Sequence, residues 1–174
     1  MELKEINFYP DEVRINKEIL DYVKKNYTTK IDKIPNFSIL KKIPEFESIE
    51  NIFVVYLINF PKLKEFIKEL MKTNKENQKV YSELSKIYGT EAGISFRYNK
   101  CILIDDSLKI IEPTIIHEII ELITRSHDSA TLCEIIFVRD NLKIGIDEYY
   151  NQTFKRDILS TKYSQLKKAE NSLR

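Results

Sequence analysis

The residues best suited to chemistry lie in segment 113–128, which reads PTIIHEIIELITRSHD. Its apolar periodicity predicts a helix that begins at Pro113. On this helix His117 and Glu121 are four residues apart and point in the same direction, so both can share one metal ion. Glu118 follows His117 directly, where a carboxylate can act as general base toward a metal-bound water. The spacing therefore predicts a zinc site in which Glu118 is the catalytic residue.

A catalytic zinc ion usually takes three protein ligands, so one further residue is needed. The candidates are Glu134, Glu148, Asp147 and His127. Spacing does not choose among them, and our prediction names Glu134 as the third metal ligand beside His117 and Glu121. His127 lies too far along a continuous helix to reach His117. It could contribute only if the chain turns back after Arg125.

The same region resembles a known family. A hairpin-like stretch, GISFRYNKCILIDDSL, ends in the apolar strand ILID and is followed by a helix with the pair His-Glu. Over residues 93–127 this pattern is similar to the zincin metallopeptidases, in particular small HExxH proteins related to phage-repressor-cleaving and stress-regulator proteases. The resemblance implies a zinc cofactor and peptidase activity. Glu121 stands where the family has its second histidine, so the motif here is HExxE.

The helix is also compatible with a purely structural role. Its polar residues share one stripe: Thr114, His117, Glu118, Glu121, Arg125 and Asp128. Its isoleucines and Leu122 share the opposite face, as on a helix with one face in water. Glu121 and Arg125 would then form an ordinary ion pair along the helix surface.

The composition excludes several function classes. The 174 residues have a formal net charge of +1 and contain three glycines, Gly89, Gly93 and Gly145. Phosphate-binding loops need clustered glycines, and neither GxGxxG nor GxxxxGK[ST] occurs, so we expect no nucleotide partner. The balanced charge is not that of a general nucleic-acid binder. The C-terminal run 154–174 interleaves basic residues with Tyr163, so nucleic-acid binding through this helix stays an alternative.

The chain shows no signal for a membrane or a secreted location. Residues 1–14 are charged and lack the apolar region of a signal peptide. The longest apolar run, 52–60, is interrupted by Asn59 and is too short to span a bilayer. Cys101 and Cys133 lie in apolar, strand-like runs and are predicted to be buried thiols. We expect a cytoplasmic protein without a membrane partner.

Two adjacent carboxylates, Asp105 and Asp106, offer another metal-dependent chemistry. Carboxylates gathered on magnesium are typical of nuclease centres. No strand-borne ExK spacing follows them, however. We therefore interpret the pair as part of a turn that leads to the next helix.

The predicted elements alternate between helices and hairpins. Apolar periodicity predicts helices over 16–27, 61–71, 80–88, 113 to about 126, and from 148 onward. Strands are predicted over 2–8 and 52–58, with hairpins over 93–105 and 132–146. Hairpins favour an antiparallel or mixed sheet. We expect a single α+β domain over residues 1–174, in which a sheet of hairpins packs against amphipathic helices.

Three functions follow from these patterns. The first is a non-enzymatic interaction or regulatory protein of viral, plasmid or defence origin on a degenerate zincin-like scaffold, acting through a protein partner or a homo-oligomer. The second is a divergent zinc metallopeptidase that uses His117, Glu118 and Glu121. The third is a nucleic-acid-binding protein that uses the basic C-terminal helix. Zinc is the one cofactor that the residues suggest.

Overall fold

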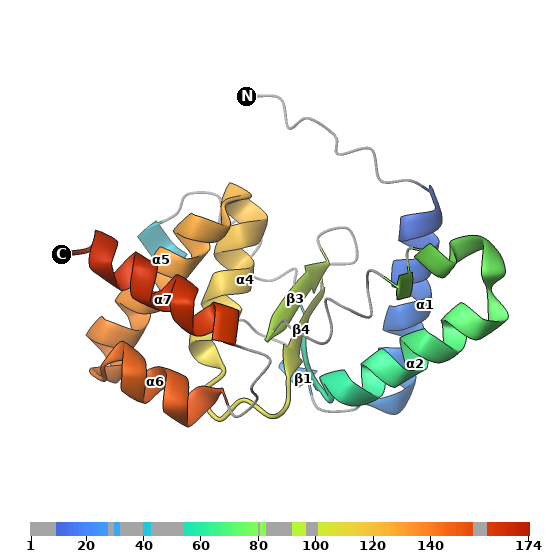
Figure 1. The fold of residues 1–174 in the computed structure, drawn as a ribbon, viewed down its shortest axis with the longest axis horizontal. Helices are drawn as coiled ribbons and strands as arrows, with labels where there is room; N and C mark the ends of the chain where they lie inside the picture. The colour runs from blue at the N-terminus through green and yellow to red at the C-terminus, as the bar shows by residue number, and fades with distance from the viewer. Residues whose placement is uncertain are drawn as a thin grey trace.

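A four-stranded mixed sheet lies at the centre of the fold (Figure 1). The computed structural model describes residues 10–27, 30–31, 40–42, 54–79, 81–82, 92–96, 101–154 and 160–174. The strands are β1 (Lys30–Ile31), β2 (Val54–Ile58), β3 (Gly93–Phe96) and β4 (Cys101–Asp105), in the order β1-β2-β4-β3. β2 and β4 are parallel, and the two outer strands are antiparallel to their neighbours. The predicted α+β class with a mixed sheet is confirmed.

Helices cover both faces of the sheet. One face carries α1 (Pro10–Asn26) and α2 (Phe60–Thr73), and the other carries α4 (Glu112–Thr124), α5 (His127–Phe137), α6 (Ile146–Thr153) and α7 (Ser160–Ser172) (Figure 1). Short 3-10 turns occur at Leu40–Lys42 and Lys75–Asn77. α2 ends at Thr73, and the second of these turns follows it directly after Asn74.

The central strand β4 divides its side chains between two apolar cores. Ile102 and Ile104 belong to the core beneath α4 to α7, whereas Cys101 and Leu103 belong to the core beneath α1 and α2. This alternation is the period of two that a strand imposes. All five residues of β4 are buried because the sheet is covered on both faces.

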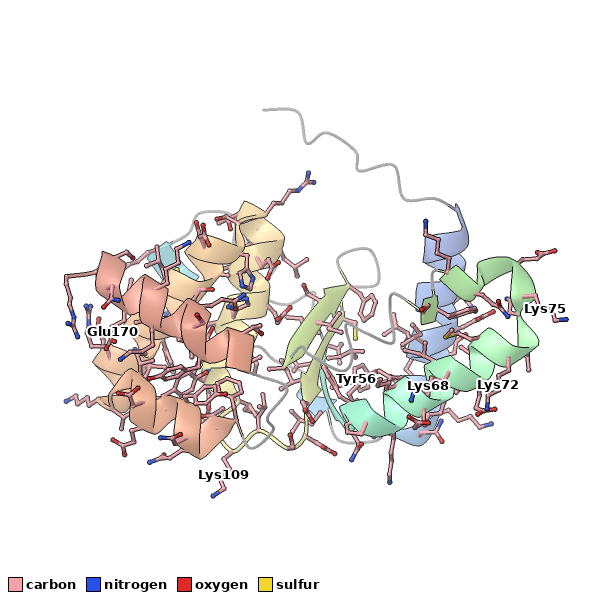
Figure 2. All side chains as sticks on the ribbon, viewed as in Figure 1. Tyr56, Lys68, Lys72, Lys75, Lys109 and Glu170 are labelled. Atoms are coloured by element: carbon pink, nitrogen blue, oxygen red, sulfur yellow. The ribbon has the colours of Figure 1, made fainter. Side chains whose placement is uncertain are left out.

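The helix α2 separates the second core from solvent. Asn59 caps it by accepting a hydrogen bond from the Lys62 backbone N–H, with Pro61 in the first turn. Figure 2 shows Tyr56 between the sheet and α2, while Lys68 and Lys72 lie on the outer side of that helix. The amphipathic pattern predicted for this segment is confirmed.

The prediction of a second hairpin over 132–146 is wrong. The chain instead forms α5, which continues as a π-helix over Val138–Leu142 and ends at Lys143 in the left-handed conformation. β-branched residues suggested strands, but the buried positions Ala130, Glu134, Ile135 and Val138 follow the helical period. Packing against α4 outweighs the local strand propensity.

The C-terminal segment is two helices rather than one. α6 ends at Thr153, and Phe154 follows it as a buried residue of the core. The predicted strand over 2–8, the turn at Asn99 and most of the predicted helix over 80–88 lie outside the residues that the structure describes. Across those described ranges, no helix has both the length and the apolar character needed to cross a membrane.

Candidate metal centre

A sharp turn between α4 and α5 brings the two histidines of the chain together. Arg125 ends α4 in the left-handed conformation, with φ of 55°, and its N–H donates to the Glu121 carbonyl. Ser126 then caps α5 by accepting a hydrogen bond from the Ser129 N–H. Because the chain reverses here, His127 returns to the level of His117, which satisfies the condition that sequence spacing left open.

Three side-chain atoms form a nearly equilateral triangle at this turn. His117 Nε2 lies 3.2 Å from Glu121 Oε2 and 3.3 Å from His127 Nδ1. His127 Nδ1 lies 3.4 Å from Glu121 Oε2. Among the residues that the structure describes, His117, Glu121 and His127 form a group whose ligand atoms are close enough to share a metal ion.

The outer nitrogen of each imidazole faces an acceptor oxygen. His117 Nδ1 lies 2.9 Å from Glu134 Oε2, and His127 Nε2 lies 3.2 Å from Gln165 Oε1. A carboxylate and an amide oxygen only accept, so both outer nitrogens carry hydrogen. In the neutral rings, the inner nitrogens therefore present lone pairs to the triangle. This is the tautomer in which histidine binds metal.

Glu134 is the buried anchor behind His117. Its carboxylate is fully inaccessible to solvent. Oε2 also accepts from Lys162 Nζ at 2.6 Å, and Oε1 accepts from the Tyr149 hydroxyl at 2.8 Å. Three donors thus satisfy the negative charge that burial would otherwise make costly.

The ionisation of this network follows from the same contacts. Burial raises the pKa of Glu134, but the Lys162 charge and the hydrogen bond from His117 outweigh it and lower the pKa to about 2. Burial and Lys162 lower the pKa of His117, but hydrogen bonds to Glu121 and Glu134 outweigh them and raise it to about 9. Burial, followed by the Glu134 charge, raises the pKa of Tyr149. Without a metal ion, His117 is therefore protonated at neutral pH.

The predicted site residues occupy different places around the triangle. His117 and Glu121 point to it, as the helical spacing predicts. Glu134 contacts the opposite nitrogen of His117, so its position is that of a ligand's hydrogen-bond partner, and His127 occupies the third corner. Asp147 and Glu148 lie exposed on α6, where Asp147 accepts from Tyr163 and Glu148 accepts from Gln152.

Glu118 points toward the edge strand β3. A Cβ atom built on Gly93 would lie 2.9 Å from Glu118 Oε1 and 2.9 Å from Thr114 Cγ2. The glycine therefore leaves the space that the carboxylate occupies. Glu118 is only 7% exposed, so this candidate base lies in a largely dry environment beside the sheet.

If α4 had a purely structural role, its polar stripe was expected to face water. Thr114, His117 and Glu118 are instead buried on the side of α4 that carries them. Glu121 is 41% exposed and contacts both histidines. The stripe is therefore an internal polar surface along its first half and opens to solvent from Glu121 onward.

From the sequence, His127 is a candidate ligand but Glu134 is preferred, because spacing along the chain does not show that the chain turns back after Arg125. The signal was present in Ser126, a strong N-cap residue, and in Asp128, an acid in the first turn of α5.

The basic C-terminal run also has internal partners. Lys162 binds Glu134, and Lys167 binds Asp147 and Glu170.

The pair Asp105 and Asp106 forms the predicted turn. The Ser107 N–H donates to Asp105 Oδ1, and the Asp106 N–H donates to the Ile58 carbonyl. The two cysteines are free thiols, with Cys101 buried on β4 and Cys133 partly exposed on α5.

Comparison of the chain with models of protein families, with curated proteins and with solved structures finds no significant match. The chemistry of this centre is therefore inferred from its own geometry.

Proposed function

We propose that this chain binds zinc through His117 Nε2, Glu121 Oε2 and His127 Nδ1. The observation that carries the proposal is the triangle of these atoms, with sides of 3.2, 3.3 and 3.4 Å. The outer nitrogens of both rings are committed to acceptors, so the inner lone pairs converge with a carboxylate. In the neutral state, three such acceptors repel one another unless a cation or a proton lies between them.

The size of the triangle favours zinc. Tetrahedral zinc with bonds of about 2.0 to 2.1 Å separates its ligand atoms by roughly 3.3 to 3.4 Å. Octahedral magnesium with bonds of similar length separates them by about 2.9 Å and prefers oxygen ligands. Two imidazoles and one carboxylate also belong to the ligand types that zinc selects.

The same geometry supports a catalytic rather than a structural metal. Structural zinc sites are closed by four protein ligands, whereas catalytic sites take three and leave a position for water. The triangle offers three ligands, and both Glu121 and His127 are about two-fifths exposed. We therefore propose a hydrolytic centre of zincin type, with HExxE and a histidine from the next helix in place of HExxH. Zinc would activate water here, and Glu118 is the base that would accept the proton.

Metal content tests the zinc site. Protein purified without a polyhistidine tag and without chelator should contain about one equivalent of zinc. His117→Ala, His127→Ala and Glu121→Ala should each lose it. Glu148→Ala is the matched control, because Glu148 is an exposed glutamate of α6 that contacts Gln152. A wild-type protein that takes up no zinc even after its addition contradicts the site, and the triangle then holds a proton on His117.

Replacement of Glu118 tests whether the chain is an enzyme or a non-enzymatic protein. Glu118→Gln keeps the size of the side chain and should retain zinc. The zinc-loaded wild type should hydrolyse members of a quenched fluorescent peptide library, and the variant should lose that activity by at least a hundredfold, as for loss of a general base. Zinc binding without cleavage by the wild type would instead support a regulatory protein with a metal site.

A further inference from the structure

The C-terminal helix α7 contacts His127 directly and His117 through its partner Glu134. Lys162 Nζ lies 2.6 Å from Glu134 Oε2, the oxygen that also faces His117. Gln165 Oε1 lies 3.2 Å from His127 Nε2. Residues three apart share one face of a helix, so a single face of α7 contacts the outer nitrogen of His127 and the carboxylate that faces the outer nitrogen of His117.

Apolar and polar contacts together attach α7 to the rest of the fold. Leu166 is its fully buried residue, and Ala169 packs against the same core from a partly buried position. The Tyr163 ring packs against the Tyr150 ring of α6, with centroids 5.0 Å apart, and further contacts are polar. Tyr163 donates to Asp147 on α6 at 2.6 Å, and Lys167 lies 3.6 Å from the same carboxylate. Lys162 and Gln165 add two polar contacts between α7 and the candidate metal centre, the second of them from an exposed side chain.

The hydrogen bond from His127 depends on how its ring is protonated. Gln165 Oε1 can only accept, so the contact requires hydrogen on His127 Nε2. A metal ion on Nδ1 selects this tautomer, because the coordinated nitrogen cannot carry hydrogen. The ion also withdraws charge from the ring and makes Nε2–H a stronger donor. Metal binding at the triangle therefore strengthens the contact with α7.

We propose that Gln165 is a positioning residue for the zinc ligand His127, and that zinc binding and the docking of α7 stabilise each other. This inference rests on the zinc site proposed above. The coupling is reciprocal: whatever factor zinc contributes to the docking of α7, docked α7 contributes to zinc affinity. Lys162 adds to the docking through Glu134, and Gln165 carries the dependence on the metal.

Zinc affinity of four proteins tests the positioning role. The Gln165→Leu variant keeps the helix but removes the acceptor, so we expect zinc to bind about tenfold more weakly, the usual cost of losing a ligand's hydrogen-bond partner. Gln165→Glu restores an acceptor and should bind zinc at least as tightly as the wild type. Tyr163→Phe is the control, because it removes an α7 hydrogen bond that does not reach the metal centre. Its zinc affinity should fall by much less than that of Gln165→Leu, because the acceptor for His127 is retained.

Hydrogen exchange of the full-length protein, with zinc or with chelator, tests the coupling. In the wild type and in Tyr163→Phe, zinc should slow exchange of the amides of α7. In Gln165→Leu, zinc should slow the exchange of these amides less than in the wild type, by about the same factor by which the zinc affinity falls. Wild-type protein that binds zinc with unchanged exchange in α7, or equal zinc affinities for Gln165→Leu and Tyr163→Phe, would overturn the inference alone. Wild-type protein that binds no zinc would overturn the proposed function and this inference with it.

Discussion

His117 and His127 are ten residues apart in the sequence, yet their ring nitrogens lie 3.3 Å apart across the α4–α5 turn. The ring centroids are 4.8 Å apart and the rings are inclined at 70°. One ring is buried and the other is partly exposed. The pair therefore joins an internal charge network, centred on Glu134, to the surface of the molecule. Four predictions follow from this arrangement and its surroundings.

Zinc affinity should increase with pH. Because the pKa of His117 in the metal-free protein is raised to about 9, zinc must displace a proton from Nε2 at any lower pH. We expect the apparent Kd for zinc to fall about tenfold for each pH unit between roughly 6.5 and 9 and to level off above that range. Competition with a chromophoric chelator at several pH values measures it. An apparent Kd that does not change over this range would show that His117 is neutral before zinc binds.

The metal-free protein should show the opposite trend in stability. A folded pKa of about 9 for His117, against 6.5 as its ordinary value, means that the folded state binds the proton more tightly. The resulting stabilisation is complete below pH 6.5 and is lost as the pH rises through 9. Urea unfolding in the presence of chelator should show this decline. His117→Gln lacks the titrating group, and its stability should be nearly constant over the same interval.

Removal of the Glu134 carboxylate should be the most destabilising change in the network. Glu134→Ala leaves the Lys162 ammonium and the buried Tyr149 hydroxyl without this acceptor. Breaking a buried ion pair by removing one partner costs about 3 to 5 kcal/mol of unfolding free energy. Asp140→Ala removes the partner of Arg139 in an exposed pair and should leave stability unchanged. Equal stabilities of the two variants by urea unfolding would contradict the anchoring role of Glu134.

Gly93 should not tolerate a side chain. An added Cβ would lie 2.9 Å from both the Glu118 carboxylate and the Thr114 methyl group, so one of them must move. We expect Gly93→Ala to lower the unfolding free energy by about 1 to 3 kcal/mol and to displace Glu118. Gly145→Ala is the matched control, since nothing lies within 4 Å of its Cβ position. Thermal unfolding compares the two proteins, and equal destabilisation of both would refute the tight fit at Gly93.

The elements that local patterns predict well are those with strong, uninterrupted periodicity. This rule holds for the strand β2, the helix α2, the hairpin strands β3 and β4, and the helix that begins beside Pro113. Their apolar residues and their caps act over a few positions along the chain. The α+β class follows directly from these elements.

Long-range packing decided the remainder. The segment 132–146 is rich in β-branched residues, and its helical state arises because Ala130, Ile135 and Val138 fill the core against α4. The single predicted C-terminal helix divides because Phe154 packs into that core after α6. Neither contact can be predicted from local propensity, because each joins residues that are distant in the sequence.

The sequence alone determined that His117 and Glu121 share one direction, because helical geometry depends only on spacing. Tertiary structure decided which residues join them. Arg125, in the left-handed conformation, reverses the chain and places His127 beside His117. The packing of α5 and α7 places Glu134 and Gln165 at the outer nitrogens and Lys162 beside Glu134. The reason is physical: a metal centre requires side chains from separate elements to converge within a few ångströms, and only the packed core sets those distances.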